Sequence, residues 1–233
     1  MNELRVVAAG DAVLVAEFAG LIDPAVNARA VNLSRALSAD HMAGVRDIVP
    51  TFRTVAVYFD PLVVDPDALA RRLRELGDAT TDDASANAAE VDIPVCYDPE
   101  LGPDIEEVAR FAGLTPDDVV AIHTGRIYRV FMLGFVPGFA YLGTVDERIA
   151  TLRRATPRVQ VPAGSVAIAG RQTGVYPSRT PGGWNIIGRT PLAMVSWDRD
   201  PFTLLNPGDV VRFRPIDRDE FDRAVGVRAG QPS

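Results

Sequence analysis

The sequence predicts an α+β protein with two domains, a ferredoxin-like α/β sandwich over residues 1–88 and a strand-rich barrel or sandwich over residues 89–217. Three observations support this prediction. Strand-like and helix-like hydrophobic patterns alternate in the first part of the chain. A small, polar and acidic run, Asp78–Ala89, then has the composition of a linker. Beyond Thr124, glycine and proline repeatedly interrupt short apolar runs, which is typical of barrels and sandwiches.

The first domain is expected to follow the order strand, strand, helix, strand, strand, helix. The predicted strands are Val6–Ala8, Ala12–Phe18, Val45–Pro50 and Thr54–Phe59. Each predicted helix begins after an Asp-Pro pair, because aspartate caps a helix N-terminus and proline suits its first turn. These helices are Ala25–Leu37 after Asp23–Pro24, and Asp67–Leu76 after Asp65–Pro66, with Gly77 expected to end the second.

The second domain is expected to begin with a strand and two short helices and to continue almost entirely as strands. The predicted strand is Val91–Tyr97, and the helices are Pro103–Ala112 and Thr115–Ala121. The later strands are expected at Ile127–Gly134, Val166–Ala169, Gly174–Tyr176, Trp184–Gly188, Leu192–Val195 and Val210–Arg214. A helical period recurs only near Val145–Leu152. Residues 218–233 are predicted to form a polar C-terminal tail with one helical turn.

Composition excludes several classes of function. The net charge is −7 over 233 residues, which disfavours non-specific nucleic-acid binding. All 24 basic residues are arginine, so a Schiff-base lysine, a P-loop lysine and the serine-lysine pair of amidases are excluded. The single cysteine, Cys96, excludes an internal disulfide, and two histidines argue against an imidazole-rich metal site. We expect a cytoplasmic protein without a metal site or membrane span.

Arginines are concentrated in one part of the chain. Residues 126–189 hold nine arginines but only two acids, Asp146 and Glu147. One interpretation is a surface that binds anions, because guanidinium groups match carboxylate and phosphate oxygens. The other is that these arginines pair with acids from elsewhere in the fold.

Glycine-rich motifs provide the candidate pocket residues. Gly134–Gly143 combines tight-turn residues with Phe135, Phe139 and Tyr141, which could wall a small-molecule pocket or fill the core. A second motif, Pro162–Pro177, presents Gln172, Thr173 and Tyr176. A third, Pro181–Pro191, adds Trp184, Asn185 and Arg189. Ser165 lies outside any nucleophile-elbow pattern, so a catalytic triad is not expected.

His123 follows a predicted helix and precedes Gly125. A histidine there could act as a general base near neutral pH, or it could be structural. His41 lies in an ordinary connection, and Cys96 follows a strand as a small buried hydrophobe would.

Four motifs in succession resemble one family. They are G-F-V-P-G-F-A-Y-L-G from Gly134, T-P-R-V-Q-V-P-A-G-S-V-A-I-A-G-R-Q-T-G-V-Y-P from Thr156, P-G-G-W-N-I-I-G-R-T-P from Pro181 and L-L-N-P-G-D-V-V-R-F from Leu204. The chain thereby resembles the family variously labelled allophanate hydrolase subunit 1, the KipI sporulation-kinase inhibitor and the 5-oxoprolinase B subunit. The resemblance covers nearly the whole chain.

The resemblance implies a cyclophilin-like β-barrel (the carboxyltransferase-type domain) after the α/β domain. It also implies a hetero-oligomer with two partners: a homologous second subunit, of the type labelled allophanate hydrolase subunit 2 or the 5-oxoprolinase C subunit, together with the 5-oxoprolinase A subunit as the third. The implied activity is ATP-dependent opening of 5-oxoproline to glutamate, since a phosphorylated intermediate lowers the barrier to opening a stable lactam. ATP, with Mg²⁺, is the implied cofactor, bound with or by a partner subunit. The alternative is a KipI-like regulator that inhibits a sensor histidine kinase.

The four motifs together predict one pocket on the barrel domain. We expect His123 and Gln172 to be catalytic, because they can exchange protons or hold a carbonyl oxygen. The expected substrate-binding residues are Phe135, Phe139, Tyr176, Trp184 and Arg189, in which the aromatics exclude water and the arginine holds an anion. No metal ligands are predicted.

Overall fold

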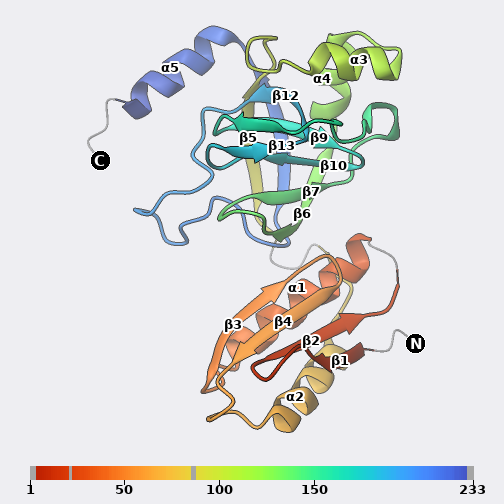
Figure 1. The fold of residues 1–233 in the computed structure, drawn as a ribbon, viewed down its shortest axis with the longest axis vertical. Coiled ribbons are helices and arrows are strands. Elements are labelled where there is room, and N and C mark those ends of the chain that lie inside the picture. Colours follow the sequence, from red (N-terminus) through yellow and green to blue (C-terminus); the bar gives the residue numbers. More distant parts are fainter. Residues whose placement is uncertain (1–3, 21–22, 85–87, 230–233) are drawn as a thin grey trace. The chain divides into compact units, whose positions relative to one another are not determined.

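The structure is a computed structural model that describes residues 4–20, 23–84 and 88–229. The chain forms two compact units, residues 1–88 and residues 89–233 (Figure 1). Each unit has its own hydrophobic core. No helix in the described residues is long and apolar enough to cross a membrane.

The first unit is a four-stranded antiparallel sheet with two helices on one face (Figure 1). Its elements are β1 (Leu4–Ala8), β2 (Val13–Phe18), α1 (Pro24–Ala39), β3 (Val45–Pro50), β4 (Thr54–Phe59) and α2 (Pro66–Ala79). The strands lie in the order β1-β2-β4-β3. Alternate residues of β2 and β4 are buried against the helices, as a half-covered sheet requires. The predicted α+β class and element order are confirmed.

The two Asp-Pro pairs begin the helices of this unit as predicted. Asp23 accepts a hydrogen bond from the Val26 amide at 2.9 Å, and Asp65 accepts one from the Asp67 amide at 3.0 Å. The prediction that Gly77 ends the second helix is wrong, because α2 continues to Ala79. Gly77 is buried in the helix where a side chain would collide with Leu4, so this glycine permits close packing.

The second unit is built on a closed seven-stranded barrel in the order β10-β7-β6-β13-β5-β12-β9. Its strands are β5 (Glu90–Cys96), β6 (Ile127–Leu133), β7 (Ala140–Gly143), β9 (Ser165–Ala169), β10 (Gln172–Val175), β12 (Asn185–Arg189) and β13 (Val210–Ile216). All neighbours are antiparallel except β5 and β13. The helices α3 (Ile105–Ala112) and α4 (Pro116–Thr124) contact β12 and β13 respectively. The predicted barrel is confirmed.

One side of the barrel is covered by a two-stranded ribbon of β8 (Arg158–Val161) and β11 (Thr180–Gly182). All five residues of β9 are therefore buried. Val166 and Ile168 belong to the barrel core, while Ala167 and Ala169 belong to a second cluster outside the barrel wall. That outer cluster contains most of the aromatic residues of the glycine-rich motifs.

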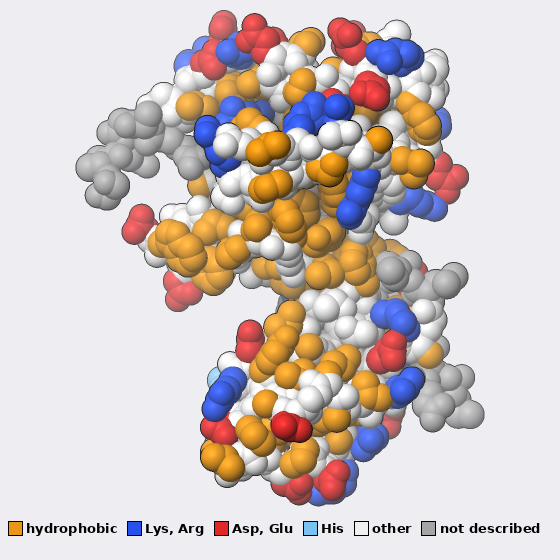
Figure 2. Space-filling model, viewed as in Figure 1, with side chains coloured by type: hydrophobic (Ala, Val, Ile, Leu, Met, Phe, Trp, Pro, Cys, Tyr) orange, Lys and Arg blue, Asp and Glu red, His pale blue; other side chains and the backbone are white. Residues whose placement is uncertain are grey.

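The predicted strand at Leu192–Val195 is wrong, because the structure has a long loop there, with only an isolated bridge between Val195 and Thr203. Met194 and Leu205 are buried in the barrel core from this loop, so the run is apolar because it fills the core. Figure 2 shows hydrophobic side chains gathered at the edge of this unit where the loop between β12 and β13 lies. Trp197 and Phe202 stack there with ring centroids 5.3 Å apart.

Three short strands, β7, β8 and β11, were not predicted from the sequence, and the C-terminal helix is longer than predicted. Instead of one turn in a polar tail, α5 extends over Arg218–Ala229. Asp217 caps it by accepting a hydrogen bond from the Glu220 amide at 2.7 Å. Phe221 anchors the helix against Cys96 and Ile216, a contact between residues distant in sequence that no local pattern predicts. Between Val145 and Leu152, the expected helical period is a single 3₁₀ turn, Glu147–Ile149.

Candidate functional site

A hollow of about 280 Å³ opens on the outer aromatic cluster of the barrel unit. Its lining residues are Phe135, Phe139, Tyr141, Arg153, Arg154, Pro157, Tyr176, Pro181, Gly182, Gly183 and Trp184. They come from the β6–β7 loop and β7, from the segment before β8, from the end of β10 and from the β11–β12 turn. Four of the predicted substrate-binding residues therefore meet here: Phe135, Phe139, Tyr176 and Trp184.

Phe139 is the centre of this aromatic cluster. Its ring makes edge-to-face contacts with Tyr141, Tyr176 and Trp184 at centroid distances of 5.0, 5.2 and 5.4 Å. Phe135 packs edge-to-face against Phe139 with ring centroids 5.6 Å apart, and Phe135 is itself 59% exposed. The hollow therefore has rigid, flat walls and a partly open aromatic edge.

Two glycines permit this packing. A Cβ atom on Gly174 would lie 2.8 Å from the Ala140 carbonyl oxygen and 3.2 Å from the Phe139 ring. A side chain on Gly182 would collide with the ring of Tyr176. The glycines of the second and third motifs are thus needed for aromatic packing, as close approach of a ring to a backbone requires.

Arg153 supplies positive charge to the hollow. Its guanidinium lies over the Trp184 ring at 5.8 Å from the centroid. No carboxylate of the described residues is within ion-pair distance of it, in contrast to its neighbour Arg154. The Asn185 amide donates to the Leu152 carbonyl oxygen at 2.7 Å, and the Arg154 amide donates to the Gly183 carbonyl oxygen at 2.8 Å. These bonds fix the segment that carries Arg153.

Asp104 holds two further arginines beside the hollow. The Arg158 guanidinium donates two hydrogen bonds to Asp104, at 2.7 and 2.8 Å, and Arg154 donates one at 2.8 Å. The Ile186 amide donates a fourth at 2.7 Å. The Asp104 side chain is only 3% exposed, so this is a nearly buried carboxylate with all its partners in place.

The structure places His123 away from this hollow. Its ring is fully buried in the barrel unit, where it stacks on Phe213 with centroids 4.6 Å apart. Burial lowers the pKa of His123 from 6.5 to about 3. Because Thr173 uses its hydroxyl proton on the Ala167 carbonyl oxygen, Nε2 of His123 donates to Thr173 at 3.0 Å, and Nδ1 accepts from the Tyr97 hydroxyl at 2.8 Å. In this position the imidazole is neutral and touches no surface hollow.

Gln172 also lies apart from the hollow, although on the same side of the barrel wall. It is the first residue of β10 and is paired with Gly143 and Ala169. Thr173 points inward to His123, so Gln172 and Gly174 face outward by the two-residue period of a strand. Gln172 is partly exposed and does not line the hollow.

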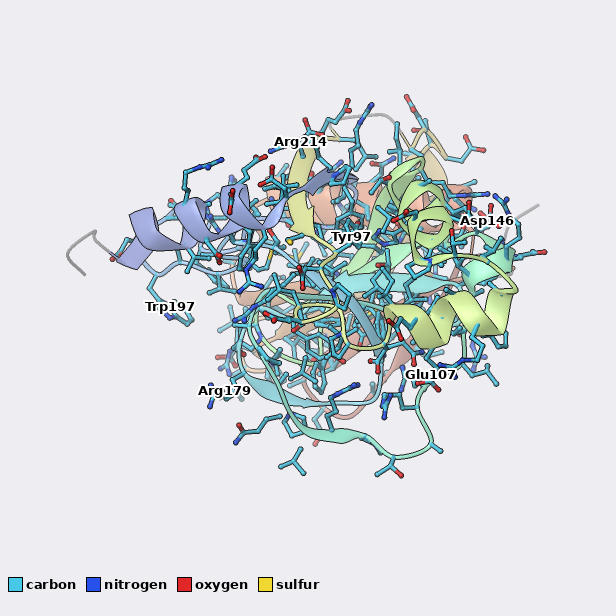
Figure 3. The ribbon with its side chains drawn as sticks, turned by 90° about the horizontal axis from the view of Figure 1, so that it is seen from above. Tyr97, Glu107, Asp146, Arg179, Trp197 and Arg214 are labelled. Atoms are coloured by element: carbon cyan, nitrogen blue, oxygen red, sulfur yellow. The ribbon has the colours of Figure 1, made fainter. Side chains whose placement is uncertain are left out.

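Arg189, the predicted anion-binding residue, lines a different hollow. It ends β12, and its Nε donates to the Ala163 carbonyl oxygen at 2.8 Å. The seven predicted residues therefore do not form one pocket. Four are in the aromatic hollow, Arg189 is elsewhere, Gln172 is on the barrel wall and His123 is in the interior. In Figure 3, Tyr97, the hydrogen-bond partner of His123, lies over the middle of this unit, while Arg179 lies at its periphery.

Known proteins match this chain over most of its length. Residues 4–205 match the family model "Carboxyltransferase domain, subdomain C and D". The 5-oxoprolinase B subunit of Bacillus subtilis is 40% identical over 91% of this chain and 92% of its own length. The protein of the same name from Escherichia coli O157:H7 is 43% identical over 75% of this chain and 79% of its own. The chain belongs to the family of 5-oxoprolinase B subunits.

Solved structures share the fold of this chain. The conserved uncharacterized protein PH0987 from Pyrococcus horikoshii is 42% identical, covers 93% of this chain and 100% of its own, and has a TM-score of 0.56. TTHA0988 is 37% identical over 88% of this chain with a TM-score of 0.80, and the chain spans 40% of that longer protein. The urea amidolyase of Kluyveromyces lactis shares the fold at 20% identity, with a TM-score of 0.74.

The arginines of residues 126–189 differ in whether they have a carboxylate partner. Of those in residues 126–189, Arg154 and Arg158 pair with Asp104, Arg126 and Arg148 with Asp146, and Arg171 with Glu147. The prediction of acids from elsewhere in the fold therefore holds for Arg154 and Arg158, while Arg126, Arg148 and Arg171 pair with the two acids of the stretch itself. Arg153, Arg179 and Arg189 have no carboxylate at ion-pair distance among the described residues.

Sequence reasoning missed Arg153 and Asp104 as constituents of the site, whereas Tyr141 was among the aromatic residues proposed to wall a pocket. Arg153 lies in a polar segment without glycine or aromatic neighbours, and its one signal is the acid-free stretch from Ile149 to Trp197. Asp104 directly precedes the short helix α3, and an acid at this position is expected simply because it interacts favourably with the helix N-terminus. No group of three or more His, Cys, Asp or Glu is placed to hold a metal ion in the part of the chain that the structure describes.

Proposed function

We propose that this chain is the B subunit of a 5-oxoprolinase, the complex that uses ATP to open 5-oxoproline to glutamate. The observation that carries this proposal is the identity of 40–43% to curated 5-oxoprolinase B subunits, extending to 91% of the chain and 92% of the relative. Both of these relatives are subunits of an enzyme. No feature of the described residues favours the kinase-inhibitor alternative. The proposal includes two partners, a homologous second subunit together with a third, and ATP bound in the assembled complex.

The aromatic hollow fits the substrate of this reaction. 5-Oxoproline is a flat five-membered lactam that carries one carboxylate. In our proposal, Phe139, Tyr176 and Trp184 contact the ring and exclude water. The guanidinium of Arg153, which has no carboxylate at ion-pair distance among the described residues, binds the substrate carboxylate. Arg154 does not compete for it, because Asp104 already neutralises Arg154.

The chain's own residues explain why it needs partners. It has no lysine, its described residues include no metal-holding cluster, and the neutral His123 is enclosed in the barrel. In our proposal this chain binds and orients the lactam, while phosphoryl transfer depends on groups assembled with the other subunits. When ATP is bound, it supplies the phosphoryl group that activates the lactam carbonyl.

Reconstitution tests the proposal. The isolated chain is expected to release no glutamate from 5-oxoproline, whereas the chain co-purified with the second and third subunits releases glutamate only when ATP is present. Glutamate and ADP are measured in the same reaction, with each subunit omitted in turn. Turnover by the isolated chain, or full turnover by a complex lacking this chain, contradicts the proposed role.

The substrate hollow makes a separate prediction about Arg153. In the assembled complex, Arg153→Ala is expected to raise KM for 5-oxoproline roughly ten- to hundredfold, since a charge-assisted hydrogen bond is worth about 1.5–3 kcal/mol. The value of kcat is expected to change little, because the carboxylate is bound equally in ground and transition states.

Arg110→Ala is the matched control, because Arg110 is exposed on α3 of the same unit, away from the hollow. Arg153→Lys should recover part of the affinity by restoring the charge without the planar fork. An unchanged KM for Arg153→Ala excludes this hollow as the carboxylate site and leaves the assignment to 5-oxoprolinase intact.

A further inference from the structure

A second hollow of the barrel unit, of about 320 Å³, has an unusual combination of walls. Its lining residues are Ala163, Gly164, Pro177, Arg189, Thr190, Pro191, Leu192, Ala193, Val195, Phe221 and Val225. It lies between the end of β12, the turn before β9, the loop after β12 and one side of α5. Arg189 is the only charged residue among these lining residues.

The Arg189 guanidinium is held in place without a counter-ion. Its Nε donates to the Ala163 carbonyl oxygen, and none of the described residues supplies a partner for its two terminal NH₂ groups. The turn that presents this carbonyl depends on Gly164, which has φ +82° and where a Cβ atom would lie 2.5 Å from the Thr190 carbonyl oxygen. The backbone thus fixes the direction of the guanidinium and leaves four of its five N–H groups available.

A second positive charge reinforces the first. Arg179 is exposed and does not line the hollow, but it lies two residues after Pro177, which does. It makes a weak contact with Gln160, at 3.4 Å, and no described carboxylate lies within ion-pair distance of it. Burial, and then the charge of Arg179, lower the pKa of Arg189 below its usual value of 12.5. The two neighbouring positive charges repel each other at a partly desolvated arginine, and a bound anion would compensate both of them.

We propose that Arg189 and Arg179 form a binding site for a phosphate group of a small molecule, whose uncharged part contacts the apolar walls formed by Leu192, Val195 and Phe221. Two guanidiniums that have no carboxylate at ion-pair distance among the described residues favour a dianion over a single carboxylate, and their planar forks match phosphate oxygens. The site is separate from the aromatic hollow, so it adds a second ligand to the one assigned above.

The test uses the full-length chain and pyrophosphate or inorganic phosphate as the probe. Pyrophosphate is expected to raise the melting temperature above that in sodium chloride of equal ionic strength, as ligand binding to the native state must. Titration calorimetry should show that Arg189→Met weakens pyrophosphate binding at least tenfold and Arg179→Met severalfold. Arg110→Met, which removes an equally charged but exposed side chain, should leave binding unchanged.

Two further measurements distinguish a ligand site from a structural role. Without ligand, Arg189→Met is expected to melt no lower than the parent chain, since an unpaired desolvated charge is removed. Arg153→Ala should bind pyrophosphate like the parent, which separates this site from the substrate hollow. The proposal is overturned if pyrophosphate gives no shift beyond that of chloride, if Arg189→Met retains the affinity, if that variant melts substantially lower, or if glutarate binds more tightly than pyrophosphate.

Discussion

Acidification from pH 6.5 to pH 4.5 is expected to remove about 2 kcal/mol from the free energy of unfolding of the barrel unit through His123 alone. The pKa of His123 is about 3 in the folded chain and 6.5 when the ring is exposed. Between these values the unfolded chain binds a proton that the folded chain does not, so stability falls with decreasing pH by about 1.4 kcal/mol per pH unit. The loss ends only below the folded pKa.

The pH window identifies the residue responsible. Carboxylates with lowered pKa, such as Asp118, are protonated in the unfolded chain only near 3.8, so their loss of stabilisation begins below most of the window of His123. Urea unfolding can be followed by tryptophan fluorescence at several pH values, because the two tryptophans, Trp184 and Trp197, are both in the barrel unit.

His123→Gln should flatten the dependence of stability on pH between 6.5 and 4.5. It should also lower stability at pH 7 by about 1–3 kcal/mol, because the Tyr97 hydroxyl loses its acceptor. His41→Gln is the control, since His41 is exposed in the other unit. A slope that survives in His123→Gln would falsify this account of the buried imidazole.

This burial also shows why the sequence could not assign His123. Its local sequence, the end of a short helix before Gly125, is compatible with a surface base and with a core residue alike. What decides between them is the contact of α4 with β13, where Phe213 stacks on the ring, and the inward side of β10, where Thr173 accepts its proton. Both partners are distant in sequence. A catalytic role for His123 would require the barrel to open.

Local signals were sufficient where local interactions determine structure. The Asp-Pro pairs predicted both helix starts of the first unit, because the cap and the proline act within one turn. Local signals failed where packing against a distant residue determines the structure. Gly77 was predicted to end α2, but it lies within the helix and packs against Leu4. Leu192–Val195 was misassigned for the same reason, since burial in a core and strand pairing produce the same apolar run.

The candidate site likewise contains residues that local sequence could predict and residues that depend on distant contacts. The aromatic residues could be predicted as a group, because the glycines around them permit close approach of rings to backbone. Arg189 was assigned to that group because it shares a motif with Trp184. Five residues of extended strand, however, place them about 16 Å apart along β12. Arg153 is brought to Trp184 instead, by hydrogen bonds from Asn185 that fix a segment 31 residues earlier than Trp184.

Asp104→Asn is expected to lower the free energy of unfolding of the barrel unit by about 3–5 kcal/mol. The single carboxylate neutralises Arg154 and Arg158 and accepts the Ile186 amide, all within 2.8 Å. Without this carboxylate, Arg158 has no acid at ion-pair distance among the described residues and Arg154 keeps only Glu107, at 3.5 Å. Removing one partner from a nearly buried ionic cluster is strongly destabilising. Glu106→Gln, an equal change of charge at an exposed position on α3, should change stability by less than about 0.5 kcal/mol.

A double-mutant cycle separates the ionic cluster from simple loss of packing. If Asp104 acts by neutralising the arginines, Arg158→Met should recover part of the loss caused by Asp104→Asn, because it removes the guanidinium whose carboxylate partner has been lost. Additive losses in the double variant would instead assign the effect of Asp104 to its hydrogen bond with Ile186. Arg154 lines the aromatic hollow, and its segment carries Arg153. Asp104→Asn should therefore also weaken substrate binding in the assembled complex. Asp104 therefore couples the stability of the barrel unit to the shape of its candidate site.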